Sequence, residues 1–205
     1  MRNQFYGDRK DVLKWSHALR LAGAEKVVLY VVMHRPNKGS HGCDFGSVAE
    51  ADSGVAVFSQ QERKKFGLGA PRRLEDVTRL LPGRIKLVYN RYEHRERKAY
   101  FEAVRKRLTH RQKDERFVVL LDPDNGISGK CSKSEHVCKE ELLTTWSAMV
   151  PGDALIVYQH QFRDREWVSK RKSALAEAIG CDEICCSRDE DVRSVCFFEV
   201  TKVES

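Results

Sequence analysis

The sequence predicts an α/β fold, a three-layer sandwich whose mostly parallel sheet carries a C-terminal antiparallel hairpin. Short, continuously apolar segments such as 27–33, 117–121 and 154–158 are typical of parallel strands buried on both faces. Segments with helical periodicity alternate with them, which implies right-handed crossovers and helices on both faces of the sheet. The 205 residues are few enough for one core, so we expect a single domain over 1–205.

The first helix is expected over residues 8–21. Val12, Trp15 and Leu19 recur at spacings of three and four, which puts them on one helix face. Asp8 suits the N-cap position, because its carboxylate can accept a hydrogen bond from a free N–H group of the first turn. A helix and a buried strand therefore open the chain.

Regular periodicity is absent from residues 34–73, which we expect to form a long insertion. One helix is expected there near Ser59, because Ser59 and Glu62 have the spacing of a capping box and Gly67 suits the helix end. A connection of this length is more often functional than filler, so the insertion is expected to face the substrate.

Alternating strands and helices return after residue 84. Tyr100 and Val104 fall on one face of a helix, and Gly180 suits the end of another. The last two strands are expected to pair as an antiparallel hairpin. In chain order the expected elements are strand 85–90, helix 93–108, strand 116–121, helix 137–149, strand 154–158, helix 165–179, and strands 183–187 and 194–202.

The chain is basic, and the excess charge is concentrated in one stretch. It has 37 Lys and Arg against 30 Asp and Glu, a formal net charge of +7, which suits an anionic partner such as nucleic acid. Nine Lys or Arg but only three acidic residues lie between Arg91 and Lys113. We therefore expect a basic helix with a phosphate-contacting surface that includes Arg105, Lys106 and Arg107.

Membrane insertion and secretion are not expected. The longest apolar runs are far shorter than a membrane span, and the N-terminus lacks the apolar region of a secretion signal. The chain is therefore expected to be cytoplasmic, with its seven cysteines as thiols. Cys131, His136 and Cys138 are the best candidates for zinc ligands, but they lack a nearby fourth ligand, so no metal site is predicted from them.

The sharpest local signal is a polar turn directly after the apolar strand that ends near Leu121. Asp122, Asp124 and Asn125 follow in quick succession, with Gly126 closing the turn. In parallel sheets, ligands bind outside the carboxyl ends of the strands. We therefore expect these three side chains to be catalytic.

A second polar cluster ends the next expected strand. Tyr158 could stack on a base and His160 could move a proton or contact phosphate. Arg163 follows and is expected to bind nucleic acid. A half-buried tyrosine beside a polar loop is an equally good interpretation.

The third signal is at the N-terminus of the first helix. Tyr6 and Gly7 form a glycine-containing turn before Asp8, where backbone N–H groups and the helix dipole attract phosphate or carboxylate groups. Asp11 and Lys14 share a helix face, and on their own they predict only a weak surface ion pair. We expect Tyr6, Gly7, Asp8 and Lys14 to contact a cofactor or phosphate.

Two of these motifs resemble those of a known enzyme family. Asp11-Val-Leu-Lys14 after an aromatic, glycine-containing lead resembles the N-terminal motif of bacterial adenine-N6 methyltransferases that act on large-subunit ribosomal RNA. Asp122-Pro123 resembles the start of their Asp-Pro-Pro-Tyr motif. Phe-Tyr-Gly-Asp, Asp-Pro-Asp-Asn-Gly and Tyr-Gln-His together also resemble a bacterial and phage-type protein family, a likeness that implies no particular activity.

The methyltransferase resemblance implies a Rossmann-like fold and S-adenosylmethionine as cofactor. It implies that Asp122 holds the adenine amino group, a reaction that requires an exposed or flipped base. Asn125 stands where the family has its stacking aromatic, which leaves Tyr6 or Tyr158 for that role. The segment after the first strand, 30–39, lacks the family's glycine-rich turn, so the cofactor motif is degenerate.

Three functions are therefore open from the sequence. The first is a nucleic-acid-modifying enzyme on a methyltransferase-like scaffold, with His160 at the rim of the site. The second is a phosphodiesterase, nuclease or nucleotide hydrolase in which Asp122, Asp124 and Asp8 bind Mg²⁺ or Mn²⁺. The third is a catalytically inactive module that binds nucleic acid or a protein.

Overall fold

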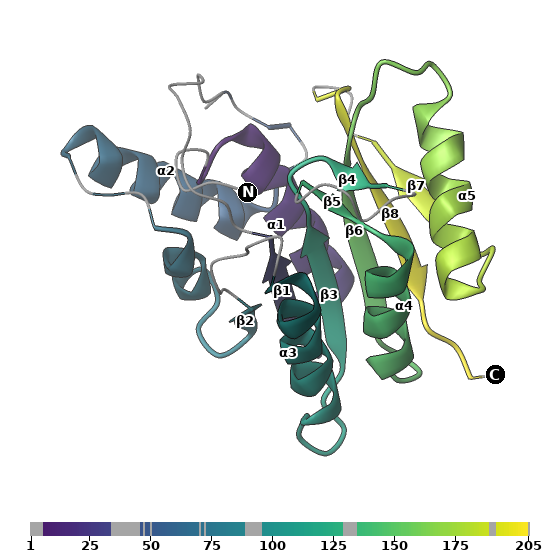
Figure 1. Cartoon of the computed structure of the whole chain (residues 1–205). Coiled ribbons are helices and arrows are strands. Elements are labelled where there is room, and N and C mark those ends of the chain that lie inside the picture. Colours follow the sequence, from purple (N-terminus) through teal and green to yellow (C-terminus); the bar gives the residue numbers. More distant parts are fainter. Residues whose placement is uncertain are drawn as a thin grey trace.

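Figure 1 shows the computed structural model of the chain, which describes residues 6–33, 46, 48–49, 51–69, 71, 73–88, 96–128, 135–188 and 192–204. Strands and helices alternate along most of it, and the expected mixed α/β class is confirmed. In chain order the elements are α1 (Arg9–Ala22), β1 (Val27–Val32), α2 (Ser53–Gly67), the 3-10 helix η2 (Leu74–Arg79), β2 (Ile85–Val88), α3 (Arg97–Thr109), β3 (Phe117–Asp122), β4 (Gly126–Ile127), β5 (His136–Val137), α4 (Lys139–Ala148), β6 (Ala154–His160), α5 (Trp167–Ile179), β7 (Cys185–Ser187) and β8 (Val195–Thr201).

The central sheet has six strands in the order β2-β1-β3-β6-β8-β7. β2, β1, β3 and β6 are parallel, whereas β8 is antiparallel to both β6 and β7. β7 and β8 are the expected C-terminal hairpin, with Ser187 opposite Phe197. Because β8 alone is reversed, β1, β3, β6 and β7 all end at one edge of the sheet. We call this the carboxyl edge, and the opposite one the amino edge.

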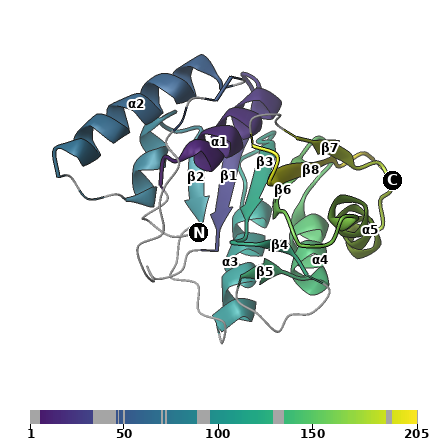
Figure 2. The same ribbon diagram turned by 90° about the horizontal axis from the view of Figure 1, so that it is seen from above.

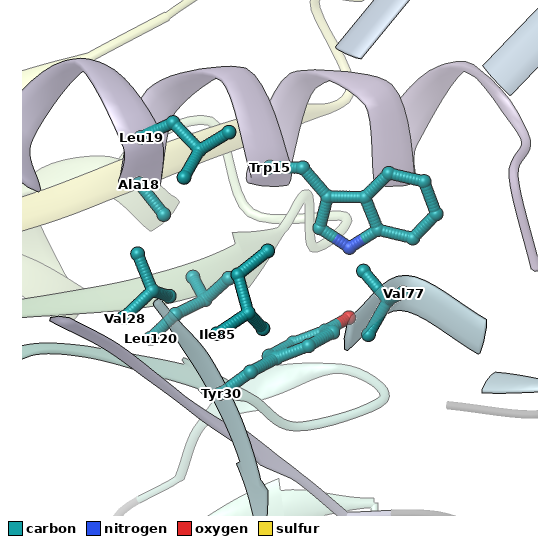
Figure 3. Close-up of a pocket in the computed structure, with 8 residues that line it drawn as sticks. All are labelled: Trp15, Ala18, Leu19, Val28, Tyr30, Val77, Ile85 and Leu120. Atoms are coloured by element: carbon teal, nitrogen blue, oxygen red, sulfur yellow. The ribbon is translucent and has the colours of Figure 1, made fainter. Parts of the chain in front are cut away.

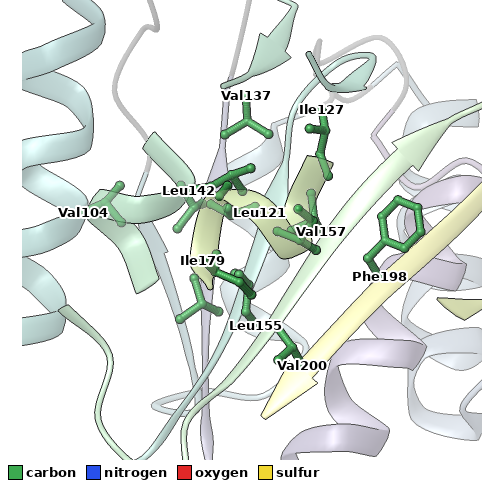
Figure 4. Packing of buried hydrophobic residues seen from close by; sticks show 14 of the residues in the cluster. Val104, Leu121, Ile127, Val137, Leu142, Leu155, Val157, Ile179, Phe198 and Val200 are labelled. Carbon is green, nitrogen blue, oxygen red and sulfur yellow. The ribbon is translucent and has the colours of Figure 1, made fainter. Parts of the chain in front are cut away.

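Helices cover both faces of the sheet (Figure 2). α1 and α2 lie on one face, and α3, α4 and α5 lie on the other. β3 explains why the apolar runs are continuous, since Leu120 is buried beneath α1 and Leu121 is buried on the α3–α5 face. Figure 4 shows Leu121 and Val157 from neighbouring strands packed with Leu142 of α4 in this second core.

The core beneath α1 is closely packed. Figure 3 shows Trp15 of α1 facing Tyr30 and Val28 of β1 around a void of about 10 Å³ with an apolar lining. Such a volume holds at most a single water molecule, and water is not favoured without polar partners. This void is therefore a packing defect and not a ligand-binding site.

The expected start of α2 was wrong. The helix begins at Ser53, because Asp52 is its N-cap and accepts hydrogen bonds from Gly54 N (2.8 Å) and Val55 N (3.1 Å). Ser59 and Glu62, the expected capping box, are buried inside the helix. The end at Gly67 is confirmed. The short parallel pair of β4 with β5 and the 3-10 helix η2 were not expected at all.

The expectation that every cysteine is a thiol was also wrong. Cys138, the N-cap of α4, is disulfide-bonded to a partner outside the described residues. Cys181, Cys185, Cys186 and Cys196 are free. Cys131 of the weak zinc candidate lies outside the described residues. None of the helices described is long and apolar enough to cross a membrane.

Candidate functional site

The site lies at the carboxyl edge, where β1, β3 and β6 end side by side. The register pairs Val32 of β1 with Asp122 of β3, and Leu121 of β3 with Val157 of β6. α1 begins over the same edge, and a hydrogen-bonded side-chain pair links Lys10 of α1 to His160 of β6. The sheet therefore brings together three motifs that lie far apart in the sequence.

Lys14 is the centre of a buried polar cluster that we call the acid–lysine centre, composed of Asp8, Asp11, Lys14, Tyr30 and Asp122. The Lys14 ammonium lies 3.1 Å from Asp11 Oδ1 and 2.9 Å from Asp122 Oδ1. It also donates to Asp122 Oδ2 at 3.0 Å, and the Tyr30 hydroxyl donates to the same oxygen at 2.7 Å. Asp11 and Asp122 are each only 1% exposed. Asp11 and Lys14 are thus part of a buried network, not a weak surface pair.

The first turn of α1 is closed by its own side chains. Gly7, with φ of 76°, donates its N–H to Asp11 Oδ2 at 3.1 Å. Asp8 is the N-cap, as expected, and accepts from Asp11 N at 3.0 Å. The Gly7 amide and one Asp8 oxygen are therefore engaged inside the protein, and this turn does not present an open anion-binding site of the kind that we predicted.

Charge in the centre is unbalanced, because three carboxylates surround one ammonium. Burial raises the pKa of Asp11 to about 8 and also raises the pKa of Asp8, in both cases against the opposing effect of Lys14. Burial alone would lower the pKa of Lys14, but Asp122 and Asp11 outweigh it and hold that pKa well above its ordinary value. Lys14 therefore stays charged at neutral pH, while Asp11 takes up and releases a proton near pH 8.

The two oxygens of Asp122 are engaged to different extents. Its Oδ2 accepts from Lys14 and Tyr30, whereas its buried Oδ1 is contacted only by the Lys14 ammonium, at 2.9 Å, within the part of the chain that the structure describes. Because a carboxylate oxygen has two lone pairs, Oδ1 can accept a further hydrogen bond, and this atom is a candidate for contact with a ligand.

His160 is the next group along the carboxyl edge. Its Nε2 lies 2.8 Å from Lys10 Nζ. Burial lowers the pKa of His160, the Lys10 charge lowers it further, and Asp124 acts in the opposite direction. Because an ammonium can only donate, the neutral imidazole accepts from Lys10 through Nε2. His160 is thus held in its neutral form, with the Nε2 lone pair occupied by Lys10, next to the acid–lysine centre.

Gln159 fixes the turn that follows Asp122. Its side chain accepts from Ile127 N at 2.8 Å and donates to Asn125 O at 3.1 Å. Gly126 has φ of 97°, and a Cβ atom there would lie 2.3 Å from the Gln159 side-chain oxygen. Asn125 therefore contributes its backbone to the turn, and the charge of Asp124 acts on His160, whose pKa it raises.

Neither tyrosine that was expected to stack on a base has a free ring face. Tyr6 is fully buried, with Trp15 at 5.4 Å and Phe66 at 5.8 Å between ring centroids. Tyr158 is 2% exposed, and the Lys14 ammonium lies 4.2 Å from its ring centroid. In this structure Tyr6 supports α1, and Tyr158 supports Lys14 through a cation–π contact.

The expected basic surface is separated from the acid–lysine centre. α3 starts at the carboxyl edge, where the Tyr100 hydroxyl donates to Val32 O at 2.6 Å. It ends at the amino edge, where Arg111 pairs with Asp153 at 2.8 Å. The last turns of α3 carry Arg105, Lys106 and Arg107, so these residues point away from the site, and Arg105 is paired with Glu102. Arg163, which follows β6, is exposed on the site's side of the sheet.

Asp11, Tyr30 and Gln159 are site residues that our sequence reasoning did not assign. Two of them carried a signal, since Tyr30 and Gln159 are polar groups inside apolar strand segments, where each needs a buried partner. Asp11 carried none beyond its helical spacing from Lys14. Only the packing of α1 against β3 shows that this pair is buried.

The described residues do not supply a set of ligands for the metal ion of the hydrolase interpretation. Among the residues that the structure describes, His, Cys, Asp and Glu side chains nowhere gather in groups of three or more that could hold a metal ion. In the acid–lysine centre, the Lys14 ammonium takes the position between the carboxylates.

Comparison with protein-family models, curated proteins and solved structures finds no match to this chain.

Proposed function

We propose that this protein is a nucleic-acid-modifying enzyme that transfers a methyl group to an exocyclic amino group of a base. One observation carries the proposal. Lys14 and Asp122 belong to the two motifs that resemble those of the rRNA adenine methyltransferases, and although 108 positions apart they meet in one buried ion pair. Residues that only cap a helix or complete a turn have no need for such a contact.

The position of this pair supports the proposal. It lies at the carboxyl edge of a mostly parallel sheet, where ligands bind in folds of this class. The antiparallel β7–β8 hairpin also suits the Rossmann-like methyltransferase fold that the resemblance implies. Fold analogy alone is weak evidence of function, so the argument depends on the chemistry of Asp122.

Asp122 Oδ1 can accept a hydrogen bond from an amino group. That contact would orient the nitrogen lone pair, and the carboxylate would be placed to receive the proton that the nitrogen loses. Lys14 and Tyr30 hold the other oxygen and so act as positioning residues. Because Asp122 is 1% exposed, a base must leave its stack and displace neighbouring side chains to reach it.

S-adenosylmethionine would supply a methyl group on a cationic sulfonium. Asp122 is the carboxylate of the acid–lysine centre that would attract this cation, because the raised pKa of Asp11 leaves Asp11 largely protonated at neutral pH. The Gly7 amide and Asp8 are already engaged in the first turn of α1, so they add no free donor. Residues 34–45, which follow β1, lie outside the described residues.

The test is transfer of labelled methyl groups from S-adenosylmethionine to unmodified RNA and DNA, together with calorimetric titration of the cofactor. We expect Asp122→Asn to lower the transfer rate at least about 100-fold. Asp164→Asn makes the same change at an exposed carboxylate paired with Lys170, and it should leave the rate unchanged. Absence of cofactor binding and of transfer, with and without nucleic acid, would overturn the proposal.

The two other functions stay predictions without a supporting observation. A metal-dependent hydrolase using Asp122 and Asp124 would require these carboxylates to converge, and the described residues contain no group of three or more such side chains that could hold a metal ion. A binding module without activity would retain its affinity for nucleic acid when both residues are replaced by alanine. Mg²⁺- or Mn²⁺-dependent cleavage of labelled RNA or DNA would favour the hydrolase.

A further inference from the structure

A polar groove lies between α1 and the C-terminal hairpin. It has a volume of about 360 Å³, which is in the range of sites that hold a small ligand. We call it the α1–β8 groove. Its lining includes Leu13, His17 and Arg20 of α1, Ser187 of β7, Arg188 just after β7, and Phe197 of β8.

Two arginines give the groove a positive charge. Arg20 comes from the last turn of α1 and Arg188 from the end of β7, and both residues are exposed. Arg188 is anchored by a hydrogen bond from Nη2 to Arg193 O at 3.0 Å and by the Trp167 ring, 5.4 Å from its guanidinium. These interactions use only part of the five donors of the guanidinium, so the remainder can bind an anion.

Glu199 lies next to the groove and is already paired with two of its lining residues. His17 Nε2 lies 2.8 Å from Glu199 Oε1, and the Ser187 hydroxyl also donates to Glu199. These hydrogen bonds, with a smaller effect of Arg20, hold the pKa of Glu199 below its ordinary value. Glu199 therefore fixes His17 and Ser187 in place, and Arg20 and Arg188 are the fully charged side chains among the described residues that line the groove.

The groove adjoins the acid–lysine centre through two aromatic rings. Phe197 lies opposite Ser187 on one side and Tyr158 on the other in the sheet register. Its ring is 6.0 Å from that of Tyr158, which bears the Lys14 ammonium, and it stacks on His17 at 4.7 Å. Asp122 is therefore two strands away from the groove, roughly 10 Å at the usual strand spacing.

We infer that the α1–β8 groove binds backbone phosphate groups of the nucleic acid, next to the base that Asp122 holds. This inference rests on the proposed function. Two arginines on opposite walls of a groove at this distance from Asp122 suit the phosphates that flank a displaced base. Of the two arginines of the groove, Arg188 follows the carboxyl end of β7, whereas Arg105 and Arg107 lie toward the amino edge.

The test compares two charge reversals of equal size by fluorescence anisotropy with labelled single-stranded RNA and DNA over a range of salt concentrations. One variant combines Arg20→Glu with Arg188→Glu, and its control combines Arg105→Glu with Arg107→Glu. For the groove variant we expect the slope of log affinity against log salt to fall by about 2, one for each phosphate that an arginine no longer binds. The control should keep the wild-type slope. All four arginines are exposed, so thermal unfolding should show both variants folded.

Two results would overturn the inference: an unchanged slope for the groove variant, or an equal fall in both variants. Inorganic phosphate and a mononucleotide serve as competitors. If phosphate or the mononucleotide displaces RNA at a low competitor concentration, the groove is a site for a small phosphate compound. This result also overturns the inference. Binding that depends on the groove without methyl transfer would refute only the proposed function, and transfer with wild-type binding by the groove variant would refute only the groove.

Discussion

Two buried carboxylates, one at each edge of the sheet, show how a structural ion pair differs from a candidate reactive one. Asp153 at the amino edge accepts from Arg111 through both oxygens, at 2.9 and 2.8 Å. Each oxygen also accepts a backbone N–H, from Phe117 at 2.8 Å and from Val150 at 2.9 Å. One positive charge thus meets one negative charge, and both oxygens are hydrogen-bonded.

Asp122 at the carboxyl edge is equally buried but incompletely satisfied. It shares one ammonium with two other carboxylates, and its Oδ1 accepts no hydrogen bond from the described residues. The Lys14 ammonium lies 2.9 Å from that oxygen, but no backbone N–H of the described residues reaches it, in contrast to both oxygens of Asp153. The difference indicates that Asp153 holds strands together and that Asp122 is set to bind something else.

The largest expected effect is on the free energy of unfolding, when the same substitution of Asp by Asn is made at Asp153 and at Asp122. Asp153→Asn leaves the Arg111 charge buried without a counter-ion, so the free energy of unfolding should fall by about 3–5 kcal/mol. Asp122→Asn relieves repulsion among three carboxylates, and Lys14 keeps Asp11, so the decrease should be under about 1 kcal/mol. Urea unfolding measures both. Equal decreases would mean that Asp122 is a structural residue like Asp153.

A smaller effect concerns the turn after Asp122. Gly126→Ala places a Cβ atom 2.3 Å from the Gln159 side-chain oxygen in a left-handed conformation, and it should destabilise the protein by about 2–4 kcal/mol. Gly69→Ala is the matched control, because φ is 86° there and no atom lies within 4 Å of the added Cβ. It should cost only about 1 kcal/mol. Equal costs would show that Gln159 yields easily and does not fix the turn.

The smallest effect tests the unbalanced charge through pH. Because burial raises the pKa of Asp11 to about 8, the folded protein binds a proton that the unfolded chain releases near pH 4. The contribution of this proton to the free energy of unfolding is complete below about pH 4 and is lost as the pH rises to about 8. Asp11→Asn removes this dependence, so its stability relative to wild type should rise by about 2 kcal/mol between pH 6.5 and pH 9, at about 1.4 kcal/mol per pH unit below pH 8.

Chemical unfolding of both proteins at several pH values measures this difference. Asp153→Asn should show no comparable gain at high pH, since Asp153 is paired one to one with Arg111. A constant difference between Asp11→Asn and wild type would contradict an excess of negative charge in the acid–lysine centre.

Much of the fold could be predicted from the sequence because local patterns specify it. The apolar run at β3 and the periodicity of α1 placed both elements within a residue or two, and Gly180 ends α5 as expected. α2 was misplaced because two capping signals compete, and the one at Asp52 lies within a stretch that lacks helical periodicity. β4 and β5 are too short for any period to reveal.

The positions of the site residues could be predicted from the sequence, but the contacts between them could not. Asp122 and His160 end parallel strands, and this alone placed them at one edge. Whether Asp11 and Lys14 face solvent or the core depends on how α1 lies across β3, which no local pattern reports. The basic helix was wrongly expected to contact phosphate for the same reason, because charge composition does not show which end of α3 lies near the site.

By itself, the sequence determined the order of strands and helices, the edge at which Asp122 and His160 emerge, and the position of the excess positive charge along the chain. These properties follow from periodicity, turn residues and the direction of parallel strands. Only the tertiary structure decided which charges are used. Burial and distance set the energy of a charge, and both come from contacts between elements such as α1, β3 and the β7–β8 hairpin that meet only when the chain is folded.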